Sequence, residues 1–415
     1  MKNRLCALAL GLSSLWACSV AQAQIALAGM TEVSGAGTAA GSSFKNGYLM
    51  GISEVNAAGG VLGQQLVLTQ YDTDTTADAV KAAAAKAVAA KPFAILGPVF
   101  SSMTASAMSQ TGESATPHFT GGEAASLTRK FHPGLLRTSL SQQGSMPRLG
   151  ALITHGLGAR KIGLIWVDNE FGQDGRAVLL PVLKRNGASV GFDGPVKSGQ
   201  KDFAQTIAAL KAAGVDALLL YVNEGEAAEM FKQLKAQGFD KPIVSDGLAA
   251  AQKVIDAAGP AADGVLVHMN MSTEVANPSV QAFVSRYVAR YGARPDQNSM
   301  KGFIAVQTIK AGVEMAGKAD PALFLKTVKD KRLEKKSYPE LMSSVSYDYF
   351  GDLNRESYFA VIQSGSSHIV ATIQSSDGGS VTLASGKQIA LNSNEFRSEI
   401  KASAQPGADK AASPR

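Results

Sequence analysis

Cysteine is almost absent from this chain of 415 residues, which has two, Cys6 and Cys18. Both lie in the first 23 residues, so residues 24–415 contain no thiol. Disulfide bonds, cysteine nucleophiles and zinc sites with cysteine ligands are therefore excluded from that part of the chain. A chain of this length buries enough apolar surface to fold without such cross-links.

Metal-binding and catalytic motifs are also lacking. The five histidines are scattered without the spacing of metal ligands, and there is no Walker-type phosphate loop, H-E-x-x-H zinc helix or G-x-S-x-G nucleophile turn. The stretch Asp72-Thr73-Asp74 starts like a calcium loop, but Ala77 and Ala83 stand where that loop requires glycine and glutamate. These absences predict a protein with no metal, no cofactor and no enzymatic activity.

Charge of one sign is not in large excess either. The formal net charge is +6, but Lys2 and Arg4 at the start contribute two of these charges. Lys401, Lys410 and Arg415 against Asp409 contribute two more. The remainder is nearly neutral, which predicts no nucleic-acid binding.

No apolar run is long enough to span a bilayer, which takes about 20 residues. The first 23 residues instead combine a basic start, the apolar stretch Leu5–Val20 and the small-x-small sequence Ala21-Gln22-Ala23. This pattern predicts a signal peptide, residues 1–23, cleaved after Ala23. Lipidation of Cys18 is the alternative, and the bulky Trp16 beside that position argues against it.

Strand and helix patterns alternate from residue 25 onward. The predicted strands are 25–30, 66–71, 93–96, 161–167, 190–192, 217–222, 243–245 and 264–269. The predicted helices are 44–56, 78–90, 101–115, 172–186, 202–213, 226–237, 278–291, 298–317 and 321–329. Such alternation predicts parallel sheets covered by helices on both faces, and the restart near residue 160 indicates two similar lobes. Segments 358–363 and 368–374 predict a final hairpin.

Several segments resemble, in order, those of the leucine/isoleucine/valine-binding protein family, the type I periplasmic solute-binding proteins of ABC importers. The most distinctive is Glu54-Val55-Asn56-Ala57-Ala58-Gly59-Gly60-Val61-Leu62-Gly63. Ile95-Leu96-Gly97-Pro98, Lys201-Asp202-Phe203 and Phe350-Gly351-Asp352-Leu353 follow it in the family's order. The resemblance covers roughly residues 25–375.

The resemblance implies an α/β fold of two doubly wound parallel-sheet lobes joined by three crossovers, with the ligand in the cleft between them. Lobe 1 is then expected to comprise residues 24–139 plus 272–348, and lobe 2 residues 140–271 plus 349–375. Residues 376–400 form a C-terminal extension, and the Ala/Ser/Pro-rich residues 401–415 are expected to be a disordered tail.

In lobe 1 the resemblance places Ser101 and Ser102 against a ligand carboxylate, in keeping with the affinity of a helix N-terminus for anions. The loop containing Gly122, Glu123 and Ala124 is expected to line the same side of the cleft. Ala124 stands where branched-chain binders have a threonine, so that hydroxyl is lost, and the backbone amides of Gly121 and Gly122 are expected to approach the ligand closely. Glu123 has no evident role in the sequence.

In lobe 2 the resemblance makes Phe171 an aromatic wall, puts Asn223 where a tyrosine is usual, and pairs Asp246 with a ligand ammonium group. The expected ligand is a small amino acid or related organic acid, delivered by a periplasmic monomer to an ABC permease in the inner membrane. Two alternatives remain open. A sensor protein would have the same fold, and an exported α/β enzyme would use Asp246, Glu123 and Glu170.

Overall fold

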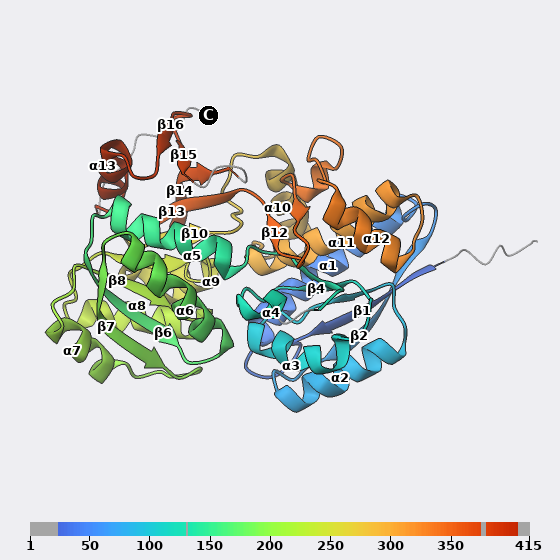
Figure 1. Ribbon diagram of the computed structural model, residues 1–415, viewed down its shortest axis with the longest axis horizontal. Helices are drawn as coiled ribbons and strands as arrows, with labels where there is room; N and C mark the ends of the chain where they lie inside the picture. Colours follow the sequence, from blue (N-terminus) through green and yellow to red (C-terminus); the bar gives the residue numbers. More distant parts are fainter. Residues whose placement is uncertain (1–23, 130–131, 375–378, 406–415) are drawn as a thin grey trace, which may run out of the picture.

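The computed structural model describes residues 24–129, 132–374 and 379–405, which form two α/β lobes side by side (Figure 1). The predicted signal peptide, including Cys18, lies outside the described residues. Within the described part, no helix combines the length and the apolar character needed to cross a membrane. The same part contains no group of three or more His, Cys, Asp or Glu side chains placed to hold a metal ion.

The first lobe is built on a sheet of five parallel strands in the order β2-β1-β3-β4-β5. The strands are β1 (Gln24–Thr31), β2 (Gln65–Asp72), β3 (Ala94–Leu96), β4 (His118–Thr120) and β5 (Leu135–Arg137). The strand order reverses between β1 and β3, as in other doubly wound sheets.

Helices cover both faces of this sheet (Figure 1). They are α1 (Thr38–Ala57), α2 (Ala77–Ala89), α3 (Ser101–Thr111), α4 (Ser126–Arg129), α10 (Pro278–Tyr291), α11 (Gln297–Ala316) and α12 (Pro321–Asp330). A short 3-10 turn η3 (Pro339–Leu341) and the two-stranded ladder of β11 (Ser346–Tyr347) and β12 (Leu353–Asn354) complete the lobe. The α1–α11 contact depends on glycine, because a Cβ on Gly47 would lie 1.9 Å from the Ser299 carbonyl oxygen.

The second lobe repeats the same parallel order in β7-β6-β8-β9-β10 and then continues with antiparallel strands. Its strands are β6 (Lys161–Val167), β7 (Ser189–Val196), β8 (Ala217–Tyr221), β9 (Ile243–Asp246), β10 (Leu266–Met269), β13 (Ser357–Gln363) and β14 (Ser366–Ile373). Its helices are α5 (Gln142–Ala151), the π-helical turn η1 (Leu152–Gly156), α6 (Glu170–Arg185), α7 (Ala204–Ala212), α8 (Glu224–Ala236), α9 (Gln252–Ala258) and the 3-10 turn η2 (Gly259–Ala261). The predicted α/β class, with a doubly wound sheet in each lobe, is confirmed, and β13–β14 is the predicted hairpin.

The C-terminal part of the chain belongs to the second lobe. Strands β15 (Ser380–Leu383) and β16 (Gln388–Ala390) lengthen its sheet beyond β14, and α13 (Asn394–Ser403) packs beside η1 (Figure 1). The expected disorder of 401–415 is wrong for residues 401–403. They continue α13, because Phe396, Ile400 and Ser403 lie on its buried side. Residues 406–415 are outside the described part.

Candidate functional site

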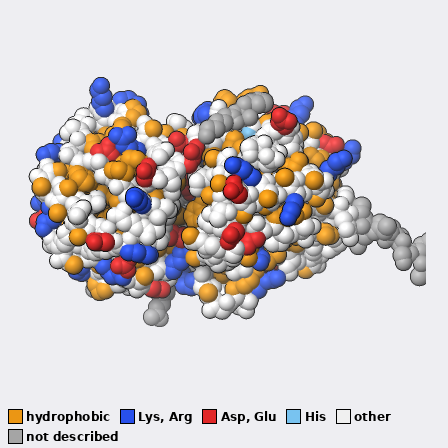
Figure 2. Space-filling model, turned by 90° about the horizontal axis from the view of Figure 1, so that it is seen from below, with side chains coloured by type: hydrophobic (Ala, Val, Ile, Leu, Met, Phe, Trp, Pro, Cys, Tyr) orange, Lys and Arg blue, Asp and Glu red, His pale blue; other side chains and the backbone are white. Residues whose placement is uncertain are grey.

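The polar side chains that could bind a ligand lie between the two lobes. In open α/β sheets, ligands bind beyond the carboxyl ends of the strands, where the strand order reverses. Here the segments after β1 and β3 in the first lobe, and after β6, β8 and β9 in the second, carry the polar side chains described below. A narrow groove with acidic and basic side chains along it separates the lobes on one face (Figure 2).

In the first lobe, Ser101 organises the loop that follows β4. Its hydroxyl oxygen accepts hydrogen bonds from the amides of Glu123 (3.1 Å) and Ala124 (3.0 Å). The Gly122 amide donates to Thr120 Oγ1 at 2.9 Å. The Gly121 amide donates to the Pro98 carbonyl at 3.0 Å, so the two glycine amides expected to face a ligand hold the loop itself, and Ala124 is fully buried.

Ser101 and Ser102 are the first two residues of α3, so their amides have no acceptor within the helix. The two amides just before them are occupied by the chain itself. Val99 and Phe100 donate to the Glu32 carboxylate at 3.2 Å. Glu32 is fully buried, and burial raises its pKa to about 7 against the lowering effect of these hydrogen bonds. The sequence analysis missed Glu32, whose only local signal is an acid directly after an apolar strand.

The role of Glu123 becomes clear from its partners. Lys301 Nζ lies 2.8 Å from Glu123 Oε1, and the two side chains are only 3% and 8% exposed. Ser139 Oγ donates to the same carboxylate oxygen at 2.7 Å, and Asn270 Nδ2 donates to Ser139 Oγ at 3.0 Å. Polar contacts thus run from α11 through the β4 loop to the segments after β5 and β10. Lys301 was also missed, although a lysine inside the buried helix α11 is a visible signal.

In the second lobe, Asp246 ends β9 and is 6% exposed. The Leu248 amide donates a hydrogen bond to Asp246 Oδ1 at 3.3 Å. Burial first, and then the negative charge of Glu123, raise the pKa of Asp246 well above its usual range, while Lys301 acts in the opposite direction. No ion pair to Asp246 occurs within the described ranges of the chain. This carboxyl group therefore lacks a bonded cation.

Phe171 has the place expected of an aromatic wall. Its ring stacks on Tyr221 with 4.2 Å between centroids and 18° between planes. Gln142 fixes both residues, since its Nε2 donates to the Phe171 carbonyl (2.7 Å) and to Tyr221 Oη (2.9 Å). Asn223 is half-buried at the start of α8 and makes no side-chain cap. The aromatic ring absent at position 223 is thus present two residues earlier, at Tyr221.

The lobes touch each other directly. The Ser126 amide and hydroxyl of the first lobe donate to Asp174 and Glu170 of α6, both at 2.7 Å. Elsewhere Asn298 Nδ2 donates to Glu224 Oε1 at 3.2 Å. These contacts join the two lobes directly, as expected of a closed arrangement.

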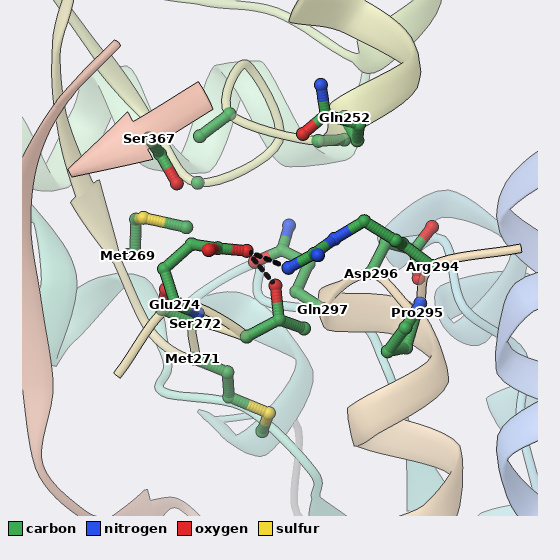
Figure 3. Close-up of a pocket in the computed structure, with 14 residues that line it drawn as sticks. Gln252, Met269, Met271, Ser272, Glu274, Arg294, Pro295, Asp296, Gln297 and Ser367 are labelled. Carbon is green, nitrogen blue, oxygen red and sulfur yellow. Dashed lines mark hydrogen bonds and ion pairs between the residues drawn. The ribbon is translucent and has the colours of Figure 1, made fainter. Parts of the chain in front are cut away.

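A small cavity of about 30 Å³ lies beside this contact, between Gly247, Gln252 and Met269 of the second lobe and residues 294–297 of the first (Figure 3). Glu274 reaches across it to Arg294, with 2.7 Å between Oε1 and the guanidinium nitrogen. One water needs roughly 10–15 Å³, so the cavity has room for about two waters. This cavity by itself is therefore too small for a solute of amino-acid size.

Comparisons with known proteins agree with this geometry. The family model described as periplasmic binding protein matches residues 24–367. A Leu/Ile/Val-binding protein of Rhizobium johnstonii is 24% identical over 83% of this chain and 93% of its own length. A leucine-, isoleucine-, valine-, threonine- and alanine-binding protein of Pseudomonas aeruginosa is 25% identical over 80% of this chain and 87% of its own.

Solved structures share the fold. A leucine-binding protein of Thermotoga maritima has a TM-score of 0.76 at 20% identity, covering 84% of this chain and 99% of its own. An ABC-transporter solute-binding protein of R. palustris in complex with benzoate has a TM-score of 0.75 at 19% identity, covering 84% and 96%. The family is one of periplasmic binding proteins, and its relatives here are solute-binding proteins and not enzymes. The chain belongs to the periplasmic binding protein family and is similar to its Leu/Ile/Val-binding members.

Proposed function

We propose that this protein captures a small amino acid, or a related carboxylate-bearing solute, between its lobes. As a periplasmic monomer exported through a cleaved signal peptide, it delivers that solute to an ABC permease in the inner membrane. The observation that carries the proposal is Asp246, a buried carboxyl group at the lobe boundary without a bonded cation. A ligand ammonium group would supply the missing charge partner.

The other end of such a ligand has a matching position in the first lobe. The amides of Ser101 and Ser102 and the Ser101 hydroxyl proton lie at the N-terminus of α3, which favours a carboxylate. The Phe171 and Tyr221 rings form an aromatic wall in the second lobe. The names of the relatives, and a Streptococcus pneumoniae neighbour solved with isoleucine, support the amino-acid assignment.

Binding then acts through the hinge. A ligand that contacts Ser101 in one lobe and Asp246 in the other stabilises the closed form over the open form by its differential affinity. The contacts of Ser126 with α6 and of Asn298 with Glu224 form only in the closed arrangement. The permease would recognise the closed surface.

The test begins with export of the full chain and recovery of the mature protein from the periplasm. A thermal-shift screen of amino acids, aromatic acids, amides and ureas identifies the ligand, and calorimetry measures its affinity. Asp246→Asn should weaken binding of an α-amino acid at least tenfold, whereas the exposed control Asp240→Asn should not. Because an ammonium group favours ionised Asp246, binding should release a proton and tighten as the pH rises. Unchanged affinity in the Asp246 variant would refute the ammonium contact.

A further inference from the structure

Five polar side chains from separate parts of the chain gather where the lobes meet, and we refer to them together as the polar subsite. They are Glu123, Ser139, Asn270, Asn298 and Lys301. Asn298 and Lys301 are three residues apart on α11 and therefore share one face of that helix. This face reaches the second lobe, because Asn298 contacts Glu224.

Two members of the polar subsite have unused hydrogen-bonding capacity. Oδ1 of Asn270 and Oδ1 of Asn298 are buried and accept no hydrogen bond from any residue that the structure describes, and the two residues are 5% and 0% exposed. The amide orientation follows from the contacts of Asn298, whose nitrogen must face the Glu224 carboxylate. A buried acceptor left without a donor costs about 1–3 kcal/mol, so a ligand that supplies an N–H donor to either oxygen gains this energy on binding.

The charges around the subsite favour the same kind of group. Lys301 is paired with Glu123, and Lys253 is paired with Glu224 at 2.5 Å. These two pairs balance each other, and the proposed function assigns Asp246 to the ligand ammonium group, so neither lysine is left free to pair with an acidic ligand side chain. An acidic ligand side chain would be repelled there, and an aliphatic one would bury both asparagine oxygens without a donor.

We infer that the polar subsite selects an amino acid whose side chain donates N–H hydrogen bonds, as a carboxamide or an amine or guanidinium cation does, over a branched aliphatic one. The inference rests on the proposed function and goes beyond it in the class of side chain. In this respect the protein differs from what the names of its Leu/Ile/Val-binding relatives say of them.

Calorimetry of the mature protein with L-glutamine, L-arginine, L-lysine, L-leucine, L-valine and L-glutamate tests the inference. At least one of the N–H donors should bind ten times more tightly than leucine or more, and glutamate should bind more weakly than glutamine. Comparison of glutamine with arginine and lysine shows whether the subsite prefers an amide or a cationic donor. Leucine or valine binding as tightly as every N–H donor would overturn the inference and leave the proposed function standing. Failure of every amino acid would overturn both.

Variants of the two asparagines test the inference through the ratio of leucine to glutamine affinity, which a purely structural role of these residues would not change. Asn270→Leu and Asn298→Leu each replace an unpaired oxygen by an apolar group and keep the branching at Cγ, so each should raise the affinity for leucine relative to glutamine about fivefold or more. Asn392→Leu, at an exposed position, is the matched control and should leave this ratio unchanged. If one variant does not fold, as judged by its melting curve, the other still decides. An unchanged ratio in a folded subsite variant would overturn the inference.

Discussion

Replacing Glu32 by glutamine should make the stability of this protein less dependent on pH. Glu32 is fully buried, with its carboxylate on the Val99 and Phe100 amides, and burial raises its pKa from 4.5 to about 7. Between these values the folded chain keeps a proton that the unfolded chain has released. The free energy of unfolding therefore falls as the pH rises through this interval and stays lowered above it.

The size of this effect follows from the pKa difference. A change from 4.5 to about 7 corresponds to about 3 kcal/mol. Glutamine stays neutral, so the stability of Glu32→Gln relative to the native protein should increase by about this amount between pH 4.5 and pH 8. If altered hydrogen bonding changes the stability of the variant equally at both pH values, the change in the stability difference between the variant and the native protein is unaffected.

Urea denaturation at both pH values, analysed by linear extrapolation, measures the difference. Glu113→Gln, at an exposed position after α3, is the matched control for the substitution itself. The reasoning is refuted if the stability difference between Glu32→Gln and the native protein stays the same at both pH values. Such a result would mean that Glu32 is as readily ionised in the folded chain as in the unfolded one.

Two further predictions concern packing and charge. Lys301→Met should lower the free energy of unfolding by about 3–5 kcal/mol, because Glu123 is left buried without its cation, and adding Glu123→Gln should restore much of the loss. In urea denaturation, a double variant no more stable than the single one would contradict this view of the pair. Phe396→Ala should lower the free energy of unfolding by about 3–5 kcal/mol, because the Phe396 ring is fully buried, with its centroid 5.7 Å from that of Phe359. Thermal melting against the exposed control Lys401→Ala measures this, and an equal effect of both substitutions would show that α13 is not part of the cooperative unit.

Local signals were enough for the long elements. Helix α10 runs over the predicted residues, because Asn277 caps it, proline follows at the first position and Gly292 ends it in the left-handed conformation. Strands β4 and β5 have three residues each, too few for a periodic pattern, and were not predicted. Helix α3 ends at Thr111, before the predicted Ala115, with Gly112 at its C-cap.

In the candidate site too, the sequence predicted some positions, whereas their contacts emerged only from the structure. Ser101, Phe171 and Asp246 follow strand ends, where a family resemblance assigns positions without knowledge of their partners. Ser101 nevertheless uses its oxygen to hold the Glu123 and Ala124 amides, a contact across 22 residues that no local pattern contains. The Glu123–Lys301 pair joins residues 178 positions apart.

By itself the sequence determined most of the longer strands and helices and the α/β class, because hydrophobic periodicity and turn residues act over a few positions. The family and its two doubly wound lobes followed from the resemblance of segments such as Glu54–Gly63. Only the tertiary structure decided the chemistry between the lobes. It buried Glu32 on the amides before α3 and paired Lys301 with Glu123. Among the described residues, it left Asp246 without an ion pair and two asparagine oxygens without a hydrogen-bond donor. The reason is physical: the energy of a charge or a hydrogen-bonding group depends on its burial and its neighbours, and both are set when distant segments pack together.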